Sequence, residues 1–215
     1  MTHPTLDEIK DGLVRYYDAD ATARDDRGEP GWRDEHRASF AGLLRSEHKR
    51  RLLEIGAGSG YSSAYFAEEG LDVIATDLSA ANVERARAKG LDAEVSDFYD
   101  LGYEDESFDA IWAMSCLVHV PDDDLPSVLE GLARVLISGG LMQVGLWEGH
   151  DEEGPWGNDP VGISNSGDDL RRFFSRRSDS RVRELFGAVF SIESFTSFVP
   201  EESDTTYQLL RLRKP

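Results

Sequence analysis

The stretch of sequence that decides the fold reads Glu54-Ile55-Gly56-Ala57-Gly58-Ser59-Gly60. It ends an apolar run that begins at Arg51 and is typical of a β-strand, and it precedes a segment with helical periodicity. A strand that turns abruptly into a helix needs glycine, because the turn requires positive φ and brings the backbone close to any ligand. Open α/β sheets bind ligands in a crevice at the carboxyl ends of their strands. The stretch therefore predicts a binding site as well as a fold.

Strands and helices alternate outward from this stretch as far as residue 147. The predicted strands are Arg51–Ile55, Asp72–Thr76, Ala93–Val95, Phe108–Ala113 and Leu141–Trp147, and the helices between them are Ser59–Glu69, Ser79–Lys89 and Asp123–Leu136. Ser59 and Ser79 are the expected N-caps. Such alternation is typical of βαβ units and predicts a mostly parallel sheet.

The two ends of the chain have a different pattern. Two amphipathic helices are predicted before the sheet, at Thr5–Asp20 and Trp32–Glu47, separated by a break at Gly28–Gly31. After the fifth strand we expect a loop-like insertion, Glu148–Arg176, followed by a helix at Ser180–Phe186. The last two strands, Val189–Val199 and Thr205–Arg213, are expected to form an antiparallel hairpin at the sheet edge.

A second acidic residue points to the kind of ligand. Asp77 ends the second strand, 21 residues after Gly56, where an acid takes the ribose hydroxyls of an adenosine cofactor. The glycines are spaced G-x-G-x-G, with Tyr61 in place of the third glycine of the dinucleotide fingerprint. The charge of Glu54 would repel a pyrophosphate but would favour a sulfonium and an ammonium. A nicotinamide oxidoreductase is therefore the less favoured of two hypotheses.

Together these residues resemble motifs I and II of the class I S-adenosylmethionine-dependent methyltransferases. The resemblance extends through Ser96-Asp97-Phe98, Phe108–Trp112 and Leu132–Gly140, and it covers roughly residues 50–147. It implies a Rossmann-like, doubly wound α/β fold with a seven-stranded sheet, mostly parallel with an antiparallel C-terminal hairpin, and an N-terminal helical cap. Ile137-Ser138 replaces a frequent Lys-Pro, which alters a turn and not a site.

The resemblance also implies a set of cofactor-binding residues. Asp77 would bind the ribose with Leu78 on the adenine face, and Asp97 would accept from the adenine amine beside Phe98. Four residues would border the methionine end and ribose: Gly56, Ala57, Gly58 and Gly60, with the negative charge of Glu54 nearby. Met114 and Ser115 would border the cofactor after the fourth strand, and Tyr17 would close over its methionine end. The alternative for Asp97 is a solvated turn, and for Tyr17 it is core packing.

The implied activity is transfer of a methyl group from S-adenosylmethionine to an O, N or C nucleophile of a small molecule, with S-adenosylhomocysteine as product. No Asn/Asp-Pro-Pro-Tyr/Phe follows the fourth strand, which disfavours methylation of base amino groups. That strand ends in Met114 and not in an acid, so no metal is expected. His119 is a candidate general base, with local hydrogen bonding as the alternative. A catalytically silent protein that binds the same cofactor and acts as a partner or regulator is the alternative function.

Specificity is expected to reside outside the motifs. Trp147 and Trp156 are predicted to form apolar walls of a substrate pocket, unless the insertion is only a surface loop. Six arginines fall between residues 171 and 183. A carboxylate or phosphate on the substrate would explain them, and so would solvated positions paired with nearby acids.

The composition excludes several classes of protein. With 42 acidic against 23 basic residues the net charge is −19, which argues against a nucleic-acid partner. No apolar run reaches 18 residues, no secretory signal is visible at the N-terminus, and the one cysteine cannot form an internal disulfide. We expect a cytoplasmic monomer or homodimer with no membrane partner. Its single domain would comprise the cap (1–48), a cofactor-binding core (49–147), a substrate-side insertion (148–176) and a C-terminal helix with the hairpin (177–215).

Overall fold

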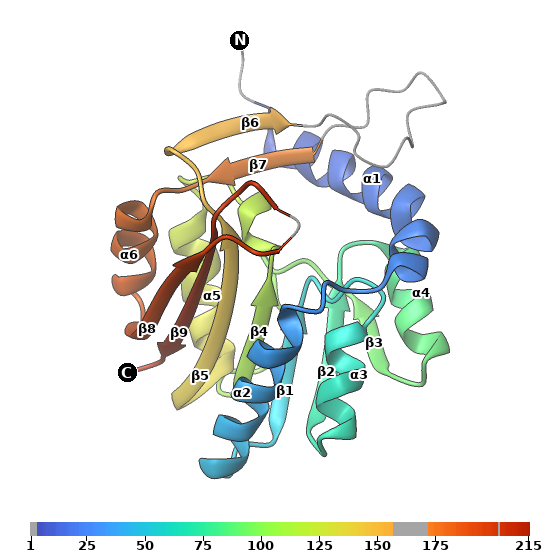
Figure 1. Cartoon of the computed structure of the whole chain (residues 1–215), viewed down its shortest axis with the longest axis vertical. Helices are drawn as coiled ribbons and strands as arrows, with labels where there is room; N and C mark the ends of the chain where they lie inside the picture. The colour runs from blue at the N-terminus through green and yellow to red at the C-terminus, as the bar shows by residue number, and fades with distance from the viewer. Residues whose placement is uncertain (1–3, 157–171, 202) are drawn as a thin grey trace.

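The chain folds around one seven-stranded sheet, shown in Figure 1, with the strand order β3-β2-β1-β4-β5-β9-β8. The computed structural model describes residues 4–156, 172–201 and 203–215. The sheet strands are β1 (Arg51–Ile55), β2 (Asp72–Asp77), β3 (Asp92–Val95), β4 (Phe108–Met114), β5 (Leu136–Trp147), β8 (Ser191–Phe198) and β9 (Tyr207–Arg213). The first five strands pair in parallel, whereas β9 runs antiparallel to both β5 and β8. The predicted fold class and the C-terminal hairpin are confirmed.

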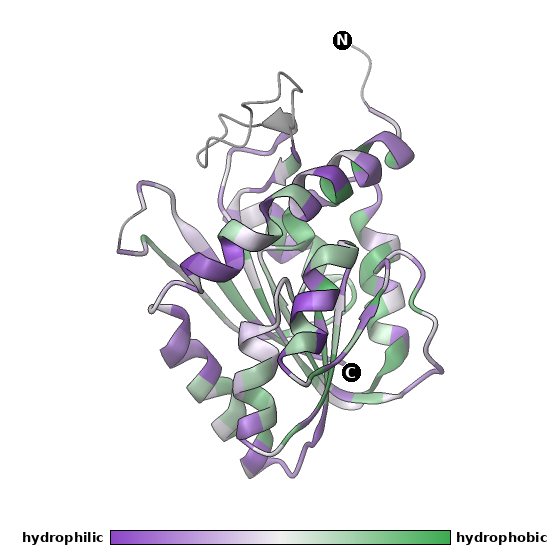
Figure 2. Ribbon diagram, turned by 90° about the vertical axis from the view of Figure 1, so that its right-hand side faces the viewer, coloured by the Kyte–Doolittle hydropathy of each residue, from purple (hydrophilic) through white to green (hydrophobic). Residues whose placement is uncertain are grey.

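Helices cover both faces of the sheet. The helices α2 (Arg33–Ser46), α3 (Tyr61–Glu68) and α4 (Ala80–Ala88) pack on one face, and α5 (Leu125–Val135) and α6 (Asp179–Gly187) pack on the other. In Figure 2 the strands are mainly green, while the helices carry both hydrophobic and hydrophilic positions. Fully buried aromatic rings hold the first face together: Trp112 packs edge-on against Phe66 and tilted against Phe40.

The N-terminal helix is longer than its sequence pattern predicted. The helix α1 spans Leu6–Arg27, starts at a capping box formed by Thr5 and Glu8, and ends at Gly28 with φ +69°. It crosses the same end of the sheet at which the parallel strands terminate (Figure 1). The predicted N-cap at Ser79 is confirmed, since its hydroxyl accepts from Asn82 N. The predicted N-cap at Ser59 is wrong, because the N-cap of α3 is the next residue, Gly60.

The prediction of a loop-like insertion is wrong for residues 152–156 and 172–176, whereas residues 148–151 form a loop as expected. Its two ends form an antiparallel ribbon, β6 (Glu152–Trp156) and β7 (Arg172–Arg176), separate from the main sheet. The residues between the strands, 157–171, lie outside the described residues. The glycines and prolines suggested a loop, but Glu153 pairs with Ser175 and Pro155 with Phe173, so these residues form strands despite their composition.

The ribbon and α1 meet above the carboxyl ends of the strands. β7 contacts both α1 and the short 3₁₀ turn η1 (Leu117–His119) that follows β4. The order of the parallel strands reverses at β1, between β2 and β4. This is the place where open α/β sheets form a ligand crevice. None of the helices in the described ranges is long and apolar enough to cross a membrane.

Candidate functional site

A cavity of about 1120 Å³ opens at this end of the sheet. Eight of the predicted cofactor-binding, catalytic and substrate-binding residues line it: Tyr17, Gly56, Ala57, Gly58, Met114, Ser115, His119 and Trp147. They come from α1, the loop after β1, the turn after β4 and the end of β5, which are far apart in the chain. The fold therefore gathers them around one space. Glu54, Gly60, Asp77, Leu78, Asp97 and Phe98 do not line this cavity.

The three motif glycines are required for different structural reasons. All three have positive φ, between +57° and +82°. A Cβ at Gly56 would overlap Cys116 Cβ, and one at Gly60 would overlap Leu91. A Cβ at Gly58 would meet no atom within 4 Å. Gly56 and Gly60 are thus required for close packing, whereas Gly58 leaves open space toward the cavity, as a ligand approaching the backbone requires.

Asp77 ties the glycine loop to the start of α4. Its Oδ2 accepts from Gly58 N and its Oδ1 from Ser79 N, both at 2.8 Å. Asn82 Nδ2 also donates to Oδ1, at 3.3 Å. Burial raises the pKa of the carboxyl, and these three hydrogen bonds oppose that rise. The carboxylate therefore lies at the end of β2, as predicted, and in this state it is held by backbone donors.

Glu54 lies beneath the glycine loop and is 3% exposed. Burial, reinforced by the nearby charge of Glu29, raises the pKa of its carboxyl to about 8. Ser63 Oγ donates a hydrogen bond to it. At neutral pH Glu54 is consequently mostly protonated until a positive charge enters the site.

Two charged residues that the sequence did not single out face the same end of the cavity. Arg33, at the start of α2, donates to Ser115 Oγ and Glu29 Oε1, both at 3.0 Å. Its side chain is 12% exposed, and both Arg33 and Glu29 line the cavity. The only signal in the sequence was their position beside the Gly28–Gly31 break. They place one guanidinium and one carboxylate where the methionine end is expected.

His119 is held by two hydrogen bonds that fix its tautomer. Its Nδ1 lies 2.7 Å from the carbonyl oxygen of Phe173, and since a carbonyl only accepts, Nδ1 carries the proton. Nε2 lies 2.7 Å from the Tyr17 hydroxyl and therefore accepts a hydrogen bond from it. Burial lowers the pKa of the ring to about 3. In this geometry the basic lone pair of His119 is occupied by Tyr17 and is not directed to the cavity.

The expected adenine side is covered by α1. Lys10 forms an ion pair with Asp97 Oδ2 at 2.5 Å and lies 4.3 Å from the centre of the Tyr99 ring. Leu78 packs with Ile9 and Leu13 of α1. Phe98 stacks on Tyr99 and packs against the core on the α5 side of the sheet. The predicted adenine-binding residues thus lie together, and α1 contacts them.

The substrate side of the cavity is built by β5 and β7. The Trp147 ring packs edge-on against Tyr207, with centroids 4.8 Å apart, and lines the cavity. Trp156 lies at the end of β6, but its side chain is outside the described residues. The sequence missed Phe174, whose ring lies 4.7 Å from His119 and also lines the cavity. The alternation of Arg172-Phe173-Phe174-Ser175-Arg176 was the available signal.

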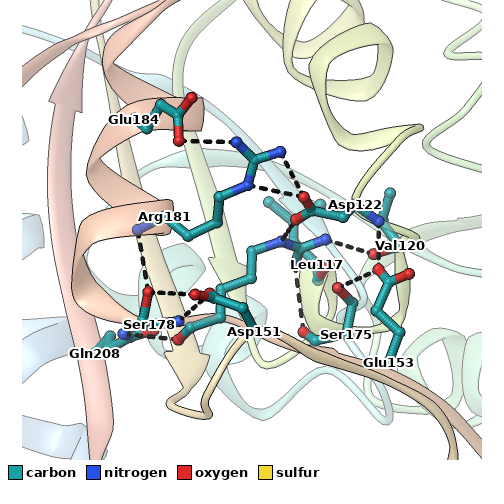
Figure 3. Close-up of polar contacts among 11 residues, drawn as sticks. Leu117, Val120, Asp122, Asp151, Glu153, Ser175, Ser178, Arg181, Glu184 and Gln208 are labelled. Carbon is teal, nitrogen blue, oxygen red and sulfur yellow. Dashed lines mark hydrogen bonds and ion pairs between the residues drawn. The ribbon is translucent and has the colours of Figure 1, made fainter.

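A buried arginine fixes the base of this region (Figure 3). Arg177 is 2% exposed, donates to Asp122 Oδ1 at 2.7 Å and to the carbonyl of Val120 at 2.7 Å. Arg181 donates to the other oxygen of Asp122 at 2.6 Å. The interpretation of this arginine stretch as solvated is therefore wrong for Arg177. Among the described residues, no group of three or more His, Cys, Asp or Glu side chains could hold a metal ion.

The comparisons with known proteins identify the same core. Residues 53–144 match the family model of the methyltransferase domain. The chain is 35% identical over 166 residues to the 27-O-demethylrifamycin SV methyltransferase of Amycolatopsis mediterranei, which covers 67% of this chain and 60% of that protein. It is 39% identical over 100 residues to a ubiquinone biosynthesis O-methyltransferase of Chelativorans, covering 44% of this chain and 39% of that protein. The chain thus spans 60% or less of the length of these curated relatives.

Solved structures share the fold over the whole chain. The 1,6-didemethyltoxoflavin-N1-methyltransferase of Burkholderia thailandensis, solved with bound S-adenosylhomocysteine, has a TM-score of 0.74 at 21% identity and covers 100% of this chain and 92% of its own. Magnesium protoporphyrin IX methyltransferase of Synechocystis, solved with S-adenosylmethionine, has a TM-score of 0.71 at 15% identity, with 100% of both chains covered. With the motifs, the sheet order and the matched domain in agreement, the chain is a member of the class I S-adenosylmethionine-dependent methyltransferases.

Proposed function

We propose that this chain transfers a methyl group from S-adenosylmethionine to an O, N or C nucleophile of a small molecule. The observation that carries the proposal is the single cavity shared by the glycine loop and the Tyr17–His119 pair. When bound, S-adenosylmethionine supplies a methyl group that its positive sulfur already activates. The protein then has mainly to align the reactants, which can supply up to roughly 7–11 kcal/mol.

The residues around the glycine loop fit such a cofactor. Open space at Gly58 accommodates close approach of a ligand, and the buried carboxyl of Glu54 suits a neighbouring ammonium. Arg33 is the residue that would take the methionine carboxylate, because its guanidinium faces the cavity at the same end. Asp77 would exchange a backbone donor for the ribose hydroxyls.

Tyr17 and His119 would act together at the reacting end. Because Nε2 of His119 accepts from the Tyr17 hydroxyl, that hydroxyl is oriented by the imidazole. A pKa of about 3 makes His119 a weak base, which favours a positioning role over direct proton abstraction. The catalytic role of His119 stays a prediction, and the hydrogen bonds support the local alternative that the sequence left open.

The remaining expectations concern setting and partners. Relatives in both comparisons carry names of small-molecule methyltransferases, which supports a small-molecule acceptor here. A net charge of −19 supports the absence of a nucleic-acid partner. We further propose a cytoplasmic protein that is a monomer or homodimer.

Calorimetry with S-adenosylhomocysteine, S-adenosylmethionine and NAD tests the cofactor. We expect the first two to bind, NAD not to bind, and Gly58→Val to lose binding because its side chain enters the open space. Asp77→Ala should weaken the cofactor by roughly 10- to 100-fold. Tight NAD binding with no response to S-adenosylhomocysteine would refute the proposal. Transfer of an isotope-labelled methyl group from S-adenosylmethionine to an acceptor, detected by mass spectrometry, distinguishes an enzyme from a protein that only binds the cofactor.

A further inference from the structure

The ribbon strand β7 turns a charged and aromatic face to the cavity. Side chains on a strand alternate between its two faces, so Arg172, Phe174 and Arg176 share one face. All three line the cavity. Two of them lie beside the Tyr17–His119 pair, since Arg172 Nη1 is 3.4 Å from the Tyr17 hydroxyl and the Phe174 ring packs on His119.

The opposite face of β7 anchors the ribbon. Phe173 is 5% exposed and packs with Ile9 and Leu13 of α1. Ser175 Oγ donates to Glu153 Oε1 at 2.6 Å, and the same oxygen accepts from Asp122 N at 2.5 Å. Figure 3 shows Ser175 and Glu153 beside Asp122. The cavity face of the ribbon is therefore held in place by residues that do not line the cavity.

The cavity lining is rich in arginine, although the chain is strongly acidic overall. Its described lining holds five arginines, Arg24, Arg27, Arg33, Arg172 and Arg176, against a single carboxylate, Glu29. A low-dielectric cavity lined by one sign of charge concentrates ligands of the opposite sign. One of these arginines suffices for the carboxylate of the cofactor.

Arg172 differs from the other four in its partners. Arg24 and Arg27 lie 3.6 and 3.2 Å from Asp20, Arg33 pairs with Glu29, and Arg176 donates to the Glu148 carbonyl at 2.7 Å. Within the parts of the chain that the structure describes, Arg172 has no carboxylate partner. Its guanidinium instead lies 4.2 Å from the centre of the Tyr16 ring and 5.0 Å from that of Phe174. Stacking on aromatic rings orients a guanidinium while leaving its donor edge available.

We propose that the acceptor is a small molecule that carries a carboxylate on a planar apolar body, and that Arg172 binds that carboxylate. The body lies between Phe174 and Trp147, both of which line the cavity. One guanidinium that has no acidic partner among the described residues matches the single charge and the two oxygens of a carboxylate. A phosphate dianion would call for a second such cation. The proposal rests on the proposed methyl transfer and names its substrate class.

The test measures binding to the full chain saturated with S-adenosylhomocysteine. The probes are matched pairs, 4-hydroxybenzoate with 4-hydroxybenzamide and 4-aminobenzoate with 4-aminobenzamide, together with phenyl phosphate. We expect each carboxylate to bind at least tenfold more tightly than its amide, with an affinity that falls as salt is added. Equal affinity within the pairs, no binding of either carboxylate, or tighter binding of phenyl phosphate would each overturn the proposal.

Variants assign the effect to Arg172. Arg172→Gln should abolish the preference for the carboxylate, and Arg172→Lys should restore part of it. Arg45→Gln is the matched control, because Arg45 is 65% exposed, pairs with Glu69 and lies outside this cavity. S-adenosylhomocysteine affinity should change less than threefold in Arg172→Gln. A large loss would mean that Arg172 serves the cofactor, which also overturns the proposal. Failure of the parent chain to bind S-adenosylhomocysteine would refute the proposed function instead.

Discussion

Single residues show which parts of the motif are required by the fold and which by the ligand. The sequence identified Gly56, Gly58 and Gly60 as one group, because spacing alone carries no information about neighbours. In the structure a side chain at the first and third would strike Cys116 and Leu91, whereas one at the second would enter open space. The role of each glycine in the motif can therefore be assigned only when the side chains packed around it are known.

Alanine substitutions at Gly56 and Gly58 should separate these two requirements. Both residues have left-handed φ, +66° and +57°, so both variants carry a similar backbone cost of about 1–2 kcal/mol. Gly56→Ala adds a clash with Cys116 worth about 1–3 kcal/mol. Chemical denaturation should thus show the larger loss of stability for Gly56→Ala. Calorimetry at a temperature where Gly58→Ala is fully folded should still show weaker binding of S-adenosylhomocysteine. Equal stability of the two variants would contradict the packing argument.

At the scale of elements, the sequence predicted the main sheet well and the ribbon not at all. The strands of the main sheet are recognisable from local apolar runs and from the glycine turns between them. The ribbon pairs Glu152 with Arg176 across a long intervening segment, and its first strand contains Gly154 and Pro155. Residues with low strand propensity form strands when tertiary contacts support them. The buried Arg177 was missed for the same reason, since its acid, Asp122, lies 55 residues away in sequence.

Arg177 should matter for stability because it joins three elements. Its guanidinium contacts carbonyls of η1 and β7 and the carboxylate of Asp122, which also receives Arg181 of α6. Arg177→Met keeps the length of the side chain but leaves these acceptors without a donor. We expect a loss of about 2–4 kcal/mol in urea unfolding. Arg183→Met, which removes an arginine of α6 that lies over Phe195, is the control and should cost less than about 1 kcal/mol. Similar losses in both variants would show that the network has no special role.

For the whole molecule, average composition concealed the local charge of the site. The net charge of the chain is −19, yet the described lining of the cavity is rich in arginine. A sum over the chain cannot show which residues converge, because Arg24, Arg33 and Arg172 come together only through the fold. The glycine loop and Asp77 were therefore predictable from motifs, whereas Arg33 and the face of β7 required the three-dimensional arrangement.

Stability of the ligand-free molecule should fall between about pH 6.5 and pH 8. The pKa of Glu54 is about 8 in the folded chain against 4.5 as its ordinary value, so the folded state retains a proton that the unfolded state has lost. This contribution is complete below pH 4.5 and disappears as the pH rises through 8. The pKa of His119, about 3 against 6.5, has the opposite effect but acts only below pH 6.5.

Urea unfolding at pH 6.5 and pH 8 checks this expectation. The parent chain should lose about 1–2 kcal/mol over that interval, and Glu54→Gln should lose clearly less. Cofactor affinity of the parent should rise with pH over the same interval, because a neighbouring ammonium favours the ionised carboxyl. Release of protons on binding, seen as a heat that depends on the buffer, measures the coupling directly. A flat stability profile in the parent would show that Glu54 titrates normally.

The alternation along β7 has a consequence for how such a protein diverges. Positions 172, 174 and 176 line the cavity, while positions 173 and 175 face α1 and the polar contacts that anchor the ribbon. Substitutions at the first set can therefore accumulate without disturbing the second. A duplicated gene could acquire a new acceptor through three codons in one short strand and inherit its cofactor site unchanged. A laboratory library restricted to those three codons is accordingly a small search space in which to evolve new methyl acceptors.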